Sequence, residues 1–164
     1  AYLLTEIANE RRKKALLLGK KFFCSGYLFA IRKKLFPKLN ENLLSEDGFI
    51  SHEVYRKRHK IDYAEKAVVY VKYPDNFRDW ILQKRRSAGG YSQLKKILNI
   101  EIRSFKKESL GAYQLIKHAK SLKELVWLIE LFLSRVYLWG KIYLDIDKNM
   151  KNREEIWKRV ESTK

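Results

Sequence analysis

The hydrophobic residues of this chain recur at helical spacing in several stretches. Residues 2 to 18 form a helical pattern that is dense in Lys and Arg, and residues 46 to 58 carry their apolar side chains on one helical face. A third helix is expected after Pro74, where Asp75 or Asn76 can cap its first backbone amides. After Gly90 the pattern is helical and predicts no strand.

Two stretches are rich in β-branched and aromatic residues instead. Residues 22 to 31, FFCSGYLFAI, predict a buried strand or turn that precedes a short helix around Arg32. Residues 61 to 73 predict two short strands, which Pro74 ends. Helices and strands therefore alternate in the first part of the chain, and this order favours α/β packing.

Residues 122 to 144 are the most apolar stretch of the chain. Charged residues interrupt it so often that it does not predict a membrane-spanning helix, which needs about 18 or more uncharged residues. Two interpretations stay open: the helix packs in a core, or it lies in a membrane interface with Trp127, Trp139 and flanking lysines as anchors. The shared apolar face consists of Leu122, Val126, Ile129, Leu133, Val136 and Tyr143.

The chain is strongly basic. Its 164 residues contain 36 Lys and Arg against 19 Asp and Glu, which gives a formal net charge of +17. This balance predicts anionic partners: nucleic acid, acidic lipid headgroups, or the phosphates of a small substrate. Cys24 is the single cysteine, which excludes an internal disulfide and fits a reducing compartment. We therefore expect a cytoplasmic protein or one on the cytoplasmic face of a membrane.

Glu46 and Asp47 form an acidic pair at the start of a predicted helix. In one interpretation the pair has only a structural role, because carboxylates in the first turn stabilise a helix through its dipole. Alternatively Asp47 is a general base, and nearby cations hold its substrate. Arg85 and Arg86, with Gln83, suit the second interpretation because a guanidinium can bind two phosphate oxygens at once; otherwise these residues form a solvated face.

Three segments resemble, in order, the second half of the catalytic domain of glycosyltransferase family 2. They are CSGYLFAIRKKLF at 24 to 36, the segment from 43 to 74, and FRDWILQKRRSAGG at 77 to 90. The family shows a Ser-Gly before a short helix, a Glu-Asp pair that opens a helix, and an extended segment that ends in Pro. A Gln-x-x-Arg-Trp or related Arg-rich motif then follows, with Gly after it.

The resemblance implies a fold and a division of the chain. Residues 1–96 would be the C-terminal half of a catalytic domain, with an α/β fold that is the acceptor-side half of a GT-A-like nucleotide-diphospho-sugar transferase. Residues 97–164 would be a helical extension that can associate with a membrane. The family's nucleotide-binding strands and its Asp-x-Asp metal motif should precede residue 1, so we expect this chain alone to be incomplete, inactive and prone to self-association.

The resemblance also implies an activity. It is the inverting transfer of a sugar from a nucleotide-diphospho-sugar to a hydroxyl of a glycan, lipid or other acceptor, with Asp47 as general base. Substrate-binding residues would be Ser25, Gly26, Glu46, Gln83, Arg85 and Arg86, the last three near the diphosphate or the acceptor. The cofactor would be Mg or Mn, whose ligands are not in this chain.

Several features depart from this pattern or compete with it. Ser87 stands where the family motif has Trp, which favours the transfer of a single sugar over processive synthesis. Asp145 and Asp147 have the Asp-x-Asp spacing, but they follow the Arg motif and are expected to be solvated charges at a helix end. The histidines His52, His59 and His118 have no metal-ligand spacing.

The alternative function is a basic nucleic-acid-binding or membrane-surface interaction module.

Overall fold

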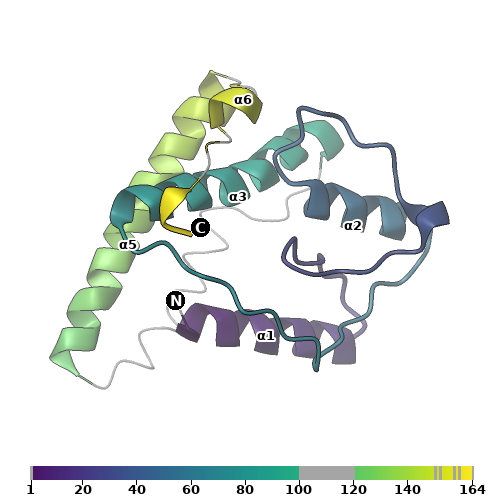
Figure 1. Cartoon of the computed structure of the whole chain (residues 1–164), viewed down its shortest axis with the longest axis horizontal. Helices are drawn as coiled ribbons and strands as arrows, with labels where there is room; N and C mark the ends of the chain where they lie inside the picture. The colour runs from purple at the N-terminus through teal and green to yellow at the C-terminus, as the bar shows by residue number, and fades with distance from the viewer. Residues whose placement is uncertain are drawn as a thin grey trace.

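The fold of the described residues consists of helices joined by long extended segments (Figure 1). The computed structural model describes residues 2–99, 121–149, 151, 153–156, 158 and 160–163. Helix α3 crosses α5, α2 packs on α3, and α1 lies apart from them across a cleft. The elements are α1 (Tyr2–Leu17), η1 (Lys33–Leu35), α2 (Glu46–Arg56), α3 (Phe77–Leu98), α5 (Leu122–Ile142), the π-helical η2 (Tyr143–Lys148), α6 (Arg153–Ile156) and η3 (Glu161–Thr163).

The main helices lie where the hydrophobic pattern predicts them. The predicted helices at 2 to 18, at 46 to 58 and after Pro74 correspond to α1, α2 and α3. Asn76 caps α3, because its Oδ1 accepts a hydrogen bond from the backbone N–H of Asp79 at 2.9 Å. The short helix predicted around Arg32 is η1, which begins one residue later.

The predicted α/β fold, an acceptor-side half of a GT-A-like fold, is wrong. A GT-A fold needs a central sheet, and the described residues contain no strand. Residues 22 to 31 form a turn, and residues 61 to 73 run extended without a β partner. β-branched and aromatic residues favour a strand only where neighbouring strands pack against them. Tyr70, which is 95% exposed, gains no such packing.

Side chains of α1 hold the segment from 61 to 73 instead. The Tyr63 hydroxyl lies 2.6 Å from Asn9 Oδ1, to which it donates, and the Tyr73 hydroxyl shares a hydrogen bond of 2.5 Å with Thr5 Oγ1. The ring of Tyr63 also meets Phe22 edge to face. These contacts place the extended segment along α1, where it forms one wall of the cleft.

The core lies around the crossing of α3 and α5. It joins residues from the loop before α2, from α3, from the end of α5 and from the C-terminal elements, and it is supported by partly buried Trp80, Ile81 and Trp139. The buried residues are Leu44, Ala88, Leu138, Ile142, Ile146 and Ile156. The C-terminal elements therefore belong to the same core as the two long helices.

Two glycines let α2 begin directly on the surface of α3. A Cβ on Gly90 would lie 2.6 Å from Ser45 Cβ and 3.0 Å from the Ser45 backbone nitrogen. A Cβ on Gly48 would lie 2.7 Å from Leu94 Cδ1. Because any larger side chain would separate the helices, these glycines fix the position of the acidic pair relative to α3.

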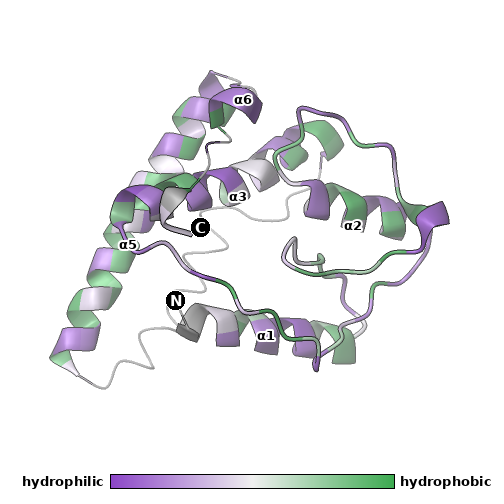
Figure 2. Cartoon of the chain, viewed as in Figure 1, coloured by the Kyte–Doolittle hydropathy of each residue, from purple (hydrophilic) through white to green (hydrophobic). Residues whose placement is uncertain are grey.

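The apolar face predicted for α5 is exposed, so its interpretation as a core face is wrong. Its six residues are 43% to 83% exposed, whereas Leu138 and Ile142 of the same helix are buried. Figure 2 shows hydrophobic residues in green along the length of α5, away from the crossing with α3. None of the described helices is long and apolar enough to cross a membrane. The membrane-interface interpretation stays a prediction.

Candidate active site

The carboxylate of Asp47 faces the Ser25–Gly26 turn from the first turn of α2. Its Oδ2 accepts a hydrogen bond from the backbone N–H of Gly26 at 3.1 Å. Its Oδ1 accepts from Ser45 Oγ at 2.7 Å and from the Gly48 N–H at 2.8 Å. Each carboxylate oxygen can accept about two hydrogen bonds. Oδ1 is therefore filled by these donors, and Oδ2 keeps one acceptor position.

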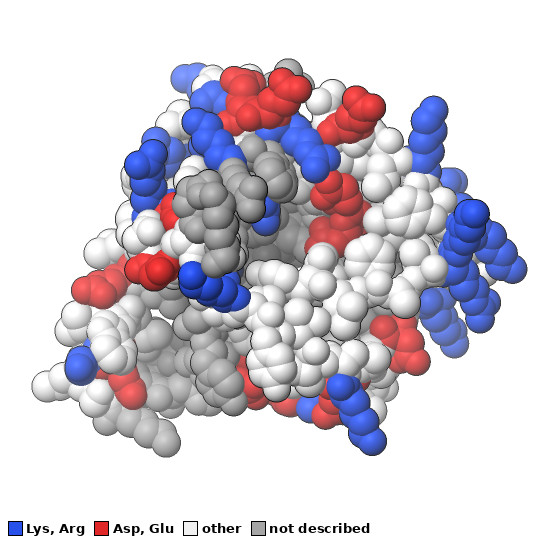
Figure 3. All heavy atoms as spheres, viewed as in Figure 1, with Lys and Arg blue, Asp and Glu red and all other residues white. Residues whose placement is uncertain are grey.

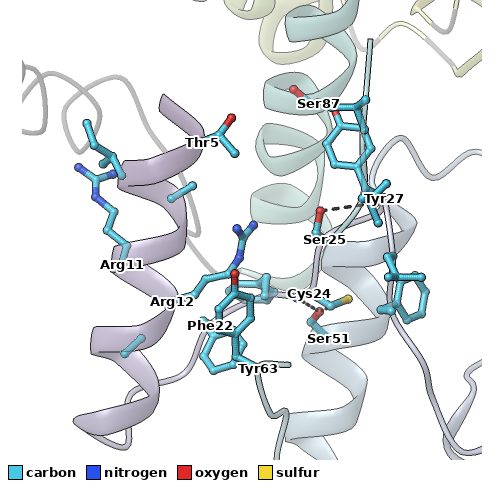
Figure 4. Close-up of a pocket in the computed structure, with 18 of the residues that line it drawn as sticks. Thr5, Arg11, Arg12, Phe22, Cys24, Ser25, Tyr27, Ser51, Tyr63 and Ser87 are labelled. Atoms are coloured by element: carbon cyan, nitrogen blue, oxygen red, sulfur yellow. Dashed lines mark hydrogen bonds between the residues drawn. The ribbon is translucent and has the colours of Figure 1, made fainter. Parts of the chain in front are cut away.

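Gly26 permits this close approach of backbone and carboxylate. A Cβ at position 26 would lie 3.3 Å from Asp47 Oδ2, closer than a side chain normally allows. The Ser25 hydroxyl accepts a hydrogen bond from the Tyr27 N–H at 3.4 Å, which keeps the turn tight (Figure 4). The structure thus brings the Ser25–Gly26 turn against Asp47, which lies 21 positions after Gly26 in the sequence.

A second set of hydrogen bonds fixes the turn on α2. The hydroxyl of fully buried Ser51 accepts from the Cys24 N–H at 2.9 Å and donates to the Asp47 carbonyl at 2.7 Å. The Tyr55 hydroxyl donates to the Phe22 carbonyl at 2.9 Å. Burial raises the pKa of the Cys24 thiol, and the negative charge of Asp47 adds to this rise. Cys24 is therefore a protonated, structural residue rather than a nucleophile.

The two adjacent arginines of α3 face different partners. Arg85 Nε lies 2.6 Å from Asp145 Oδ2 in an ion pair that is mostly buried and lacks hydrogen-bond alignment. Arg86 lies within electrostatic reach of Tyr27. Burial chiefly raises the pKa of the Tyr27 hydroxyl, the neighbouring Tyr73 adds to the rise, and Arg86 opposes it. Arg85 is thus directed toward η2, whereas Arg86 lies near Tyr27, the residue that follows the Ser25–Gly26 turn.

The remaining predicted site residues differ in their surroundings. Gln83 Oε1 is buried and has no hydrogen-bond partner among the described residues. Glu46 pairs with Arg153 of α6, its Oε1 lying 2.7 Å from Arg153 Nη1. Glu46 therefore faces the C-terminal elements, whereas the adjacent Asp47 faces the turn.

An open cleft of about 2380 Å³ lies beside this site. Its walls are α1, the turn, the extended segment, and parts of α2, α3 and α5. It exceeds the roughly 300–1,000 Å³ of a usual small-molecule pocket. Cations outnumber the two acidic lining residues, Asp62 and Glu124. The lining cations are Arg11, Arg12, Lys21, Arg32, Lys60, Lys84 and Arg135.

Arg12 is a site residue that the sequence pattern did not single out. Figure 4 shows it projecting from α1 toward the turn, while Arg11 points the other way. Its charge favours the ionised form of Cys24, so its guanidinium lies near the turn that holds Asp47. The motif-based prediction missed it because its only signal was a pair of arginines in a basic helix.

Basic charge also gathers around η1 and the end of α2, where Arg32 and Lys60 belong to the cleft lining as well. In Figure 3, Lys and Arg side chains cluster at the right edge, where Figure 1 places η1 and the end of α2. The exposed cations of these two segments are Arg32, Lys33, Lys34, Arg56, Lys57, Arg58 and Lys60. This cluster is a second surface that favours an anionic partner.

Asp145 is not the solvated charge that its position at a helix end predicts. Asp145 is buried in η2, where Lys151 Nζ contacts its Oδ1 at 2.7 Å in addition to the Arg85 contact. Asp147 also lies in η2. Among the histidines, His52 is half-buried, His59 is exposed, and His118 lies outside the described residues. No group of three or more metal-binding side chains occurs in the described part of the chain.

Comparison with known protein families connects this geometry with a class of enzymes. Residues 8–150 match the family described as Glycosyl transferase family group 2. The match covers most of the chain, so this protein belongs to that family. No curated protein and no solved structure matches the chain.

Family membership confirms the resemblance to glycosyltransferase family 2 and supports a glycosyltransferase function. It also supports a nucleotide-sugar donor and an acceptor as the partners. The assignment to a C-terminal half, the boundary between residues 96 and 97, and the roles of single residues stay predictions.

Proposed function

We propose that the protein transfers a sugar from a nucleotide-diphospho-sugar to an acceptor hydroxyl with inversion, and that Asp47 is the general base. The acceptor position left on Asp47 Oδ2, beside the turn and the basic cleft, supports this role. The acceptor hydroxyl gives its proton to Oδ2 while its oxygen bonds to the anomeric carbon. The nucleotide diphosphate leaves from the opposite side, so one displacement inverts the configuration.

The cations around the cleft stabilise the departing diphosphate in this proposal. Arg86 on α3 lies near Tyr27, which follows the turn, and Arg12 projects from α1 toward the turn. A guanidinium binds phosphate oxygens through two parallel hydrogen bonds, and fixed cations act most strongly where negative charge develops. Gln83 Oε1 is buried and Gln83 does not line the cleft, so this proposal gives the residue no direct contact with the substrate.

The test of this function is Asp47→Asn, which keeps the shape of the side chain and removes the base. Transfer by the intact enzyme from a panel of nucleotide-diphospho-sugars, measured as release of the nucleoside diphosphate, should fall by about 10²- to 10⁴-fold. Nucleoside diphosphate binding, measured by calorimetry, should change little. The matched control is Asp75→Asn, an exposed carboxylate outside the site. Equal losses of binding and turnover would make Asp47 a binding residue, and unchanged turnover would refute its role.

A second proposal concerns localisation on the cytoplasmic face of a membrane. The exposed apolar face of α5 supports it, together with Lys123 over the Trp127 ring and Lys141 over the Tyr137 ring. A helix with exposed apolar residues, aromatic rings and lysines suits the boundary between headgroups and acyl chains. Flotation with acidic liposomes but not with neutral ones is expected. Retardation of random-sequence DNA without flotation would favour a nucleic-acid-binding module instead.

A further inference from the structure

The described residues between Tyr143 and Thr163, named here the C-terminal clamp, run along α3 and reach α2 (Figure 1). At the start of α3, the Ser162 N–H donates to Asp79 Oδ2 at 3.0 Å. Further along, Ile146 packs so tightly on Gly89 that a Cβ there would collide with its Cδ1. The clamp is therefore packed on the helix that carries the Arg motif.

The first charged contact of the clamp reaches the Arg motif itself. Asp145 is 6% exposed, and its two carboxylate oxygens contact Arg85 at 2.6 Å and Lys151 at 2.7 Å. Lys96 of α3 donates to the carbonyl of Ile146 at 2.8 Å, which secures the same π-helical turn. A buried carboxylate is stable only with such partners. The proposed transfer reaction gives this group no chemical role.

The second charged contact reaches the acidic pair. Arg153 Nη1 lies 2.7 Å from Glu46 Oε1 and donates to the Glu41 carbonyl at 3.3 Å. It therefore joins the first turn of α2 to the loop that leads into it. Asp47, the next residue, faces the Ser25–Gly26 turn.

We propose that Asp145 and Arg153 are positioning residues of the transferase site. Asp145 holds Arg85 and so sets the direction of Arg86, while Arg153 holds Glu46 and so sets the first turn that carries Asp47. The clamp thereby fixes the distance between Asp47 on α2 and Arg86 on α3. The catalytic part of this inference rests on the proposed function, because it concerns the same Asp47 and Arg86.

The test compares Asp145→Asn and Arg153→Gln with Lys148→Gln, an exposed cation in the clamp without a contact to the site. Both clamp variants should lower kcat by up to about 100-fold, the effect of misplacing groups by about 1 Å. The KM for the donor should change little, and the control should keep full activity. In the double variant, Asp145→Asn should lower kcat hardly further than Arg85→Gln alone does, because the effects of residues in contact are not additive.

Amide hydrogen exchange provides a readout that does not need activity. Arg153→Gln should accelerate exchange in the first turn of α2, and Asp145→Asn should accelerate it around residues 83–90, while Lys148→Gln leaves both unchanged. If the intact enzyme transfers no sugar, the proposed function fails and amide exchange alone decides whether the clamp positions these helices. Arg153→Gln removes a partly exposed pair, so it stays informative if Asp145→Asn does not fold. Unchanged exchange, or additive effects on kcat, would overturn the inference.

Discussion

At the scale of single residues, neighbours in the motifs have separate tasks. Asp47 faces the Ser25–Gly26 turn and Glu46 faces Arg153. Arg86 lies near Tyr27, while Arg85 pairs with Asp145. The sequence could identify both pairs but could not assign separate roles to their members, because those roles depend on partners 21 or more positions away along the chain.

This division predicts different outcomes for the two arginines. Arg86→Lys should weaken the binding of UDP or GDP by about tenfold, because Lys cannot form the paired hydrogen bonds of a guanidinium. Arg85→Lys should lower the urea midpoint of unfolding more than it weakens binding, because its partner Asp145 is buried. Calorimetric titration and urea unfolding measure the two effects. Arg78→Lys, an exposed change on the same helix, is the control for both. Equal effects of the two substitutions on binding would contradict the division.

At the scale of elements, the hydrophobic pattern predicts helices well and their packing poorly. The bounds of α1, α2 and α3 follow from periodicity and from the Asn76 cap. The strand prediction for residues 61 to 73 fails because a strand depends on neighbours that no local pattern specifies. On α5 the pattern selects the wrong face, since the helix is apolar on several sides and half-buried Arg135 lies among its inward residues.

Glycine positions give a stability prediction for these elements. Gly90→Ala places a Cβ 2.6 Å from Ser45 Cβ and should lower the free energy of unfolding by about 1–3 kcal/mol. Gly140→Ala is the matched control on α5, where nothing lies within 4 Å of the added Cβ. There the better helix propensity of Ala should raise the free energy of unfolding by about 0.5–1 kcal/mol. Urea unfolding of both variants measures the difference. A Gly90→Ala variant as stable as the unmodified protein would show that α2 does not need this close approach.

At the scale of the whole molecule, charge and exposed apolar surface meet in the cleft. Basic residues line the cleft and gather around η1 and the end of α2, while α5 adds exposed apolar residues to the cleft wall and exposes Val126, Leu133 and Val136 outside the lining. Net charge is readable from composition, and it predicts anionic partners without locating them. The location requires the fold, because the cleft joins residues from α1, α2, α3, α5 and the extended segments between them.

The apolar face of α5 allows the membrane proposal to be tested on the whole protein. Replacing Val126, Leu133 and Val136 together by Gln changes three exposed residues that do not line the cleft. If burial of each side chain in the interface contributes about 1 kcal/mol to the free energy of membrane binding, partition onto acidic liposomes should fall on the order of 100-fold. The fold should persist, because the buried residues Leu138 and Ile142 are unchanged.

Flotation measures this partition, with circular dichroism as the check on folding. Glu130→Gln, an exposed change on the same helix, should float like the unmodified protein. Raising the salt concentration should weaken binding in all variants, since it screens the attraction between lysines or arginines and acidic headgroups. The triple variant should lose the part of membrane binding that resists salt, because that part comes from apolar burial. If the triple variant floats as well as the unmodified protein, α5 is not the membrane contact. If the unmodified protein is a dimer and the triple variant a monomer, the apolar face of α5 binds a second copy of the chain instead.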